Sequence, residues 1–245
     1  MTCATPPAFP ATDPVFLRIV TGGALAGCVA GVLAAALMLL FLQPLLLTAE
    51  GYEAGMAAAE TAHVHADGTV HDHSAAPAAG RNALSVAFFA LTYAAFGLML
   101  LAVMALAEER GARIDARSGV LWGAAGWAAL HMAPAFGLPP ELPGFSVADL
   151  STRQVWWFAT AAATAAGLWS LAFGRGAPAL ILGAALIAIP QLIGAPHPEE
   201  MTGPVPGELA ALYAARSLGV ALVAWIVLGA VAGRVWSGAP VRRTA

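Results

Sequence analysis

The sequence predicts an all-α fold, a polytopic membrane bundle of about six transmembrane helices with both termini in the cytoplasm. Three observations lead to this fold class. Hydrophobic residues make up 60% of the 245 residues and charged residues only 10%, whereas soluble domains carry about 25% charged residues. Six apolar runs have the length of a membrane helix, and basic and acidic residues favour opposite links. Residues 1–245 are therefore expected to form one integral membrane domain in contact with the lipid bilayer.

The first three spans are predicted from the length of apolar sequence, because a bilayer core of about 30 Å needs about 20 helical residues. The first run is longer than the about 7–15 residues of a signal-peptide core, so we expect a retained helix. Within it, Gly23, Gly27 and Gly31 recur at every fourth residue, which predicts close packing on another helix. The three spans cover Leu17–Leu47, Ala83–Ala107 and Ser118–Phe136.

The last three spans are joined by links of different kinds. The link at 174–176 is very short, which predicts an antiparallel hairpin of the fourth and fifth spans. Pro190 lies near the end of the fifth span and predicts either a break that exposes backbone carbonyls or a simple helix end. The three spans cover Gln154–Phe173, Ala177–Ile193 and Ser217–Trp236.

The charged residues predict the orientation, because arginine and lysine favour the cytoplasmic side of a membrane. With both termini inside, most of the 11 basic residues lie in the cytoplasm. These are Arg18, Arg110, Arg113, Arg117, Arg175, Arg234, Arg242 and Arg243. Most of the 14 acids then lie outside, namely Glu50, Glu53, Glu60, Asp67, Asp72, Glu141, Asp149, Glu199, Glu200 and Glu208.

Histidines cluster in the link 48–81, which has no apolar period and is predicted to be an external loop. Two His-x-His pairs stand there with Asp67 and Asp72 interleaved. Imidazole nitrogen is the commonest ligand of transition metals in proteins, so the segment predicts a metal site. A solvated loop without any ligand is the alternative. The four predicted ligands are His63, His65, His71 and His73.

Four further residues are candidate metal ligands outside that cluster. Glu50 and Glu53 stand three residues apart and share a helical face, either as ligands or as an ordinary charged helix end. His131 lies inside the third span, where an ionisable side chain indicates function by default, although a hydrogen bond to a neighbouring helix would also explain it. His197 follows the fifth span.

Several classes of protein are excluded by what the sequence lacks. It contains no GxxxxGK[ST] phosphate loop, so ATP binding of that kind is not expected. It contains no HExxH, GxSxG or CxxC motif and no catalytic pair, so it is not expected to be an enzyme or to hold a cofactor. No basic patch suggests binding of nucleic acid.

Five segments together resemble the CbtA family of predicted cobalt-transporter subunits in bacterial inner membranes. They are 50–53 (EGYE), the histidine segment, 137–144 (GLPPELPG), 153–157 (RQVWW) and 190–196 (PQLIGAP). The resemblance implies cobalt uptake linked to cobalamin synthesis and a small partner, CbtB, with one membrane span and a histidine motif. It also implies that relatives often carry histidine where this chain has Gln191, so that His131 or His197 would compensate.

The expected function is therefore uptake of a divalent transition metal, cobalt first, by a multi-pass subunit of the inner membrane. In this hypothesis the histidine loop captures the ion outside, and Glu50, Glu53, His131 and the Pro190 region form its path. Two alternatives stay open from the residues alone. One is a membrane protein that binds or senses metal without moving it, and the other is an importer of nickel or copper.

Overall fold

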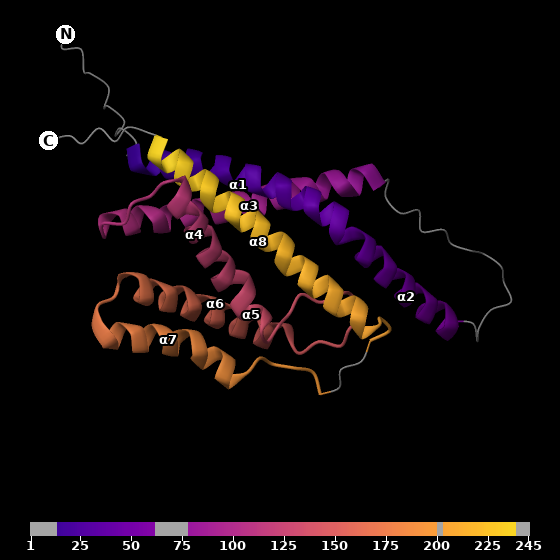
Figure 1. Ribbon diagram of the computed structural model, residues 1–245. Coiled ribbons are helices and arrows are strands. Elements are labelled where there is room, and N and C mark those ends of the chain that lie inside the picture. Colours follow the sequence, from indigo (N-terminus) through magenta and orange to yellow (C-terminus); the bar gives the residue numbers. More distant parts are fainter. Residues whose placement is uncertain (1–13, 62–77, 200–202, 239–245) are drawn as a thin grey trace, which may run out of the picture.

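The computed structural model describes residues 14–61, 78–199 and 203–238, and the part of the chain that it describes is helical with irregular links. Figure 1 shows the helices arranged as one elongated bundle. The elements are α1 (Pro14–Phe41), α2 (Gln43–Thr61), α3 (Ala78–Glu109), α4 (Ala116–Trp127), the π-helical turn η1 (Ala128–Met132), α5 (Ala133–Ala135), α6 (Leu150–Phe173), α7 (Gly176–Ile193) and α8 (Gly207–Gly238).

Five of these helices, α1, α3, α6, α7 and α8, are long and apolar enough to cross a membrane. The third predicted span is instead assembled from α4, η1 and α5, which follow one another without a gap over Ala116–Ala135. Their 12, 5 and 3 residues make 20, the number that crosses a bilayer core of about 30 Å. The all-α membrane bundle predicted from the sequence is thus confirmed.

The first predicted span is wrong at its end, because α1 stops at Phe41 and not at Leu47. Pro44 explains the break. It has no N–H to donate to the carbonyl four residues earlier, and its ring crowds that carbonyl. The chain turns at Leu42 and begins α2, where Pro44 is tolerated in the first turn. The guanidinium of Arg216 on α8 donates to the carbonyl of Phe41 at 3.2 Å, so this helix end is bound to the bundle.

The predicted loop 48–81 is also shorter than expected. Residues 48–61 continue α2, and residues 78–81 form the first turn of α3. Alanine, glutamate and methionine dominate the end of α2, and these residues have high helix propensity. The segment has no apolar period, and this indicated a loop. Its residues form a helix nevertheless, because their helix propensity is high.

Two helix pairs with glycine and alanine at their contacts form the centre of the bundle. The glycines of α1 face the backbone of α3, because a Cβ placed on Gly27 would lie 2.2 Å from the carbonyl oxygen of Tyr93. A Cβ placed on Gly229 of α8 would lie equally close to α4, 2.1 Å from the carbonyl oxygen of Gly119. The predicted glycine packing face of the first span is confirmed. Small residues permit this approach, and dispersion over the long contact stabilises it.

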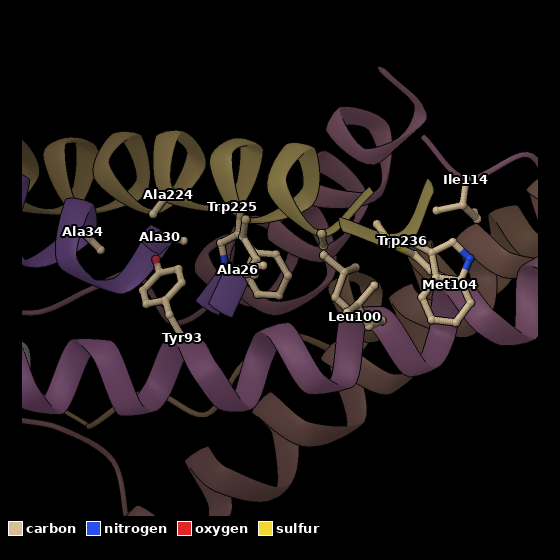
Figure 2. Close-up of a cluster of buried hydrophobic side chains, with 13 residues drawn as sticks. Ala26, Ala30, Ala34, Tyr93, Leu100, Met104, Ile114, Ala224, Trp225 and Trp236 are labelled. Atoms are coloured by element: carbon tan, nitrogen blue, oxygen red, sulfur yellow. The ribbon is translucent and has the colours of Figure 1, made fainter. Parts of the chain in front are cut away.

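A buried cluster joins α1, α3 and α8. Figure 2 shows Trp225 of α8 between α8 and α3, with Tyr93 on one side and Leu100 on the other. The Trp225 side chain is fully buried. By contrast, α6 and α7 pack mainly on each other as the predicted hairpin, with the Ser170 hydroxyl donating to the carbonyl of Ala179 at 3.0 Å.

The two ends of the bundle differ in charge. The start of α1 and the end of α8 lie at one end (Figure 1), together with the α3–α4 and α6–α7 links. We call this the basic end, because it carries Arg18, Arg110, Arg113, Arg117, Arg175 and Arg234. The opposite or acidic end contains the 136–149 link, the described parts of the 194–206 link and the start of α8. The positive-inside rule predicts that the basic end faces the cytoplasm.

Candidate functional site

The acidic end is covered by a packed cap rather than by separate loops. It combines the first turns of α2, the 136–149 link and the chain just before α8. Ala49, Leu142 and Val205 are buried together at its centre, with Phe145 and Tyr213 packed against them. This small apolar core packs the 136–149 link and the chain before α8 against α2, and it fixes the position of α2 at this end.

Glu53 is held in the cap by its contact with Gly144. The backbone of Gly144 has a φ of +85°, and a Cβ there would lie 2.4 Å from Oε1 of Glu53. Only glycine adopts this conformation without strain and also leaves room for the carboxylate. Glu53 is half-buried, whereas Glu50, one turn earlier on α2, is exposed. The two carboxylates therefore have different surroundings although they share one helix.

Two acids of the cap already have structural roles. Glu141 accepts a hydrogen bond from Arg153 at 2.6 Å in an ion pair. Asp149 caps α6 and accepts from the Ser151 hydroxyl and from the backbone N–H of Thr152. These hydrogen bonds, that of Ser151 first, lower the pKa of Asp149. Glu141 and Asp149 thus stabilise the link and the start of α6.

His131 lies inside the bundle in the π-helical turn η1. The turn is explained by Pro134, which has no N–H for the helical ladder, and the N–H of Ala133 bonds to the carbonyl of Ala128 instead. The His131 ring meets Phe96 of α3 and Trp225 of α8 edge-on, at centroid distances of 6.3 Å and 6.1 Å. Its Nε2 is buried and has no hydrogen-bond partner among the described residues. Single π-helical turns occur frequently at functional sites.

The Pro190 region ends a helix and does not interrupt it. Pro190 is inside α7, which continues to Ile193, and Gly194 ends the helix with a φ of +85°. Of the two alternatives predicted for the Pro190 region, a broken helix and a simple helix end, the structure has the simple helix end. Gln191, in the last turn, donates from Nε2 to the carbonyl of Ala133 at 3.0 Å. That bond ties α7 to the end of the third span.

The predicted ligands are not gathered into one cluster in the described part of the chain. No group of three or more His, Cys, Asp or Glu side chains there is placed to hold a metal ion. Glu50 and His197 are exposed, Glu53 is in the cap, and His131 is within the bundle. His63, His65, His71 and His73 lie outside the described residues, so the predicted histidine site stays a prediction.

Some residues of this region were not singled out by sequence reasoning. Trp225 is one, because an apolar helix gives no sign of which tryptophan contacts His131. The bond from Gln191 to Ala133 is another, since it joins two spans far apart in the chain. Pro134, three residues after His131, was the one available signal of an irregular helix at that point.

A different arrangement ties the helices together at the basic end. Arg18 of α1 stacks over the ring of Trp236 on α8, with 4.1 Å from Cζ to the centroid. The indole N–H of Trp236 donates to Glu108 of α3 at 3.2 Å. Three helices are joined here by a cation–π contact and a hydrogen bond. The basic end is therefore fastened by polar contacts, whereas the cap is fastened mainly by apolar ones.

The comparisons with known proteins identify a family. The family model described as "Probable cobalt transporter subunit (CbtA)" matches residues 16–237, which is most of the chain. No curated protein and no solved structure matches it significantly. The matched range includes the cap, the π-helical turn and the histidine segment.

Proposed function

The chain belongs to the CbtA family, and from that premise we propose that it is the importing subunit of an inner-membrane uptake system for a divalent transition metal, cobalt first. The histidine segment, with His63, His65, His71 and His73, captures the ion at the acidic end. Glu50 and Glu53 on α2 receive the ion at the cap, together with His197 on the link between α7 and α8. His131 supplies a nitrogen ligand within the membrane.

One observation carries this proposal: the Nε2 atom of His131 is buried in the bundle and has no hydrogen-bond partner among the described residues. A buried imidazole nitrogen without a hydrogen-bond partner is costly unless it binds something, and polar groups inside membranes mark ion pathways. Neutral imidazole suits cobalt, nickel, copper and zinc alike. The structural reading, a histidine bonded to a neighbouring helix, is disfavoured because its Nε2 has no such bond.

The charge distribution is a second support. Carboxylates at the acidic end raise the local concentration of a cation before it meets a ligand. The glutamates of α2 lie in the part of the chain that contributes to the cap, and they shortly precede the histidine segment in the sequence. A cation attracted to this end would meet exchangeable ligands in turn, which favours capture followed by transfer over permanent binding.

The first experiment measures cell-associated cobalt, nickel, copper and zinc in a strain lacking the protein and in one that re-expresses it, at trace external metal. We expect a deficit in cobalt alone that re-expression restores. Replacing all four segment histidines with alanine lowers uptake at trace cobalt but not at high cobalt, because capture limits only the former. A deficit in nickel or copper that re-expression restores would make that ion, and not cobalt, the transported metal.

The second experiment tests the ligands inside the bundle. His131→Phe keeps the aromatic contacts with Phe96 and Trp225 and removes both nitrogens, so we expect a folded protein without uptake at any cobalt concentration. Glu53→Gln should reduce uptake, whereas Glu199→Gln, an exposed acid on the other link, serves as its control. Normal uptake by His131→Phe would remove this residue from the path.

The family description also names a subunit, which supports a partner. We propose a small protein with one membrane span and histidines, of the CbtB kind. Reconstitution into vesicles separates the possibilities, since uptake of cobalt by this chain alone would make that partner dispensable. Binding without flux, with or without the partner, would favour a sensor that does not transport.

A further inference from the structure

A groove in the basic half of the bundle lies between α3, α4 and α6. Its volume is about 540 Å³. It exists because α6 contacts η1 and α5 closely but α4 only slightly, and Figure 1 shows α4 and α6 meeting at α5 and separating toward the basic end. Small side chains, among them Ala125, Gly126, Ala129 and Ala165, leave the inner part of the groove empty.

The length of the groove matches the depth of one bilayer leaflet. Its wall on α4 and η1 runs on one helical face from Ser118 to Leu130, which at about 1.5 Å per residue is about 18 Å. One leaflet of a bilayer core of about 30 Å is of similar depth.

The lining combines an apolar interior with a cation at one end. Arg113, in the α3–α4 link, is the only charged side chain among the described residues that line the groove, and Ser118 also lines it. Arg110 is beside them, with its Cζ 5.6 Å from the centre of the Trp169 ring that lines the groove. The described residues give neither arginine an ion pair. The groove is therefore apolar along one leaflet and positively charged at the level of the head groups.

Two of the acids near these arginines are engaged elsewhere, whereas Glu109, next to Arg110, is exposed. Glu108 accepts the indole N–H of Trp236, and Asp115 caps α4 by accepting from the backbone of Arg117 and Ser118. Arg175, in the α6–α7 link, adds a further positive charge at this end. An anion at the mouth of the groove would thus meet several cations, and two of the three acids closest to them in the sequence already have other partners.

We propose that the groove is a binding site for an anionic phospholipid, with one acyl chain between α4 and α6 and the phosphate at Arg113 and Arg110. Burial of the chain in an apolar slot supplies affinity, and the arginines select the head group. The lipid would replace the helix contact that α4 and α6 lack in this half of the bundle. The groove shares Trp225 with the surroundings of His131 but contains none of the proposed metal ligands, so the lipid site does not depend on the proposed metal transport.

Native mass spectrometry of the delipidated full chain tests this site with phosphatidylglycerol and phosphatidylcholine of the same acyl chains. We expect tighter binding of phosphatidylglycerol. Arg113→Gln and Arg110→Gln should each weaken it about fivefold, the factor that corresponds to about 1 kcal/mol per basic residue at an anionic surface. Arg234→Gln, at the same end but outside the groove, should leave it unchanged.

The acyl chain is tested by filling the groove. Ala125→Trp should reduce bound phosphatidylglycerol at least as much as the loss of an arginine, whereas Ala102→Trp on an exposed face of α3 should not. Equal binding of both lipids, or binding indifferent to Arg113 and Ala125, would overturn the proposal. A photo-reactive residue can also be placed at Leu121, which is 72% exposed. Crosslinking of that residue to a protein helix or to a second copy of the chain, instead of to lipid, would also overturn the proposal.

Discussion

Replacing Gly27 with alanine should destabilise the bundle, although the same change in a helix usually stabilises it. Gly27 is buried in α1 against α3. A Cβ there would lie 2.2 Å from the carbonyl oxygen of Tyr93 and 2.3 Å from Cα of Ala94. Both are backbone atoms of a helix, so no side chain can rotate to make room. Gly219 in α8 offers the control, because a Cβ there meets nothing within 4 Å.

The magnitude follows from the displacement that the methyl group requires. An ordinary contact needs 3.4 Å or more, so α1 and α3 must separate by about 1 Å, and a gap of that size forfeits up to about half of each dispersion contact along the pair. Overpacking of this kind costs about 1–3 kcal/mol. At exposed Gly219, alanine should instead add up to about 1 kcal/mol through helix propensity.

Thermal unfolding of the two variants in the same detergent measures the difference. At about 2–4 °C per kcal/mol for a chain of this size, Gly27→Ala should lower the midpoint by about 2–12 °C. Gly219→Ala should leave it unchanged or raise it slightly. Midpoints that shift equally, or a Gly27→Ala protein as stable as the wild type, would refute the reasoning, because the glycines of α1 would then not be required by contact with α3.

Three further predictions concern the cap, α7 and the basic end. Gly144→Ala should lower the thermal midpoint more than Gly194→Ala, because both glycines have a φ of +85° but only the first meets Glu53; equal shifts would contradict that contact. Gln191→Leu leaves a carbonyl without a donor and should destabilise by about 1–3 kcal/mol, measured by denaturant titration, and a neutral result would dismiss the bond. Trp236→Leu should be less stable than Trp236→Phe, which keeps the ring under the guanidinium, and the reverse order would exclude the cation–π contact.

Much of the fold could be predicted because membrane helices depend on length and hydrophobicity alone. The spans around α3, α6, α7 and α8 were expected, and so was the glycine face of α1. The errors arose where the backbone did not follow hydrophobicity. Pro44 divides a continuous apolar run, and the helix after it continues through polar residues because their helix propensity is high.

The candidate site was less accessible to sequence reasoning. His131 was recognisable from its position in an apolar span, but its partners, Phe96 and Trp225, come from two other helices. The role of Gly144 was also hidden, since a proline-rich string predicts a stiff link without saying which carboxylate rests on it. Contacts between distant segments depend on helix rotation and register, which periodicity in so uniformly apolar a sequence does not determine.

The tight helix pairs restrict where a cation can cross the bundle. Between α1 and α3, and between α4 and α8, backbones approach so closely that even a methyl group does not fit, so no ligand side chain and no ion can enter there. The buried hydroxyls of Thr160 and Thr164 lie instead on α6, which packs on η1, and their oxygens have no partner among the described residues. If the proposed transport is correct, the ion passes beside η1 and not between α1 and α3.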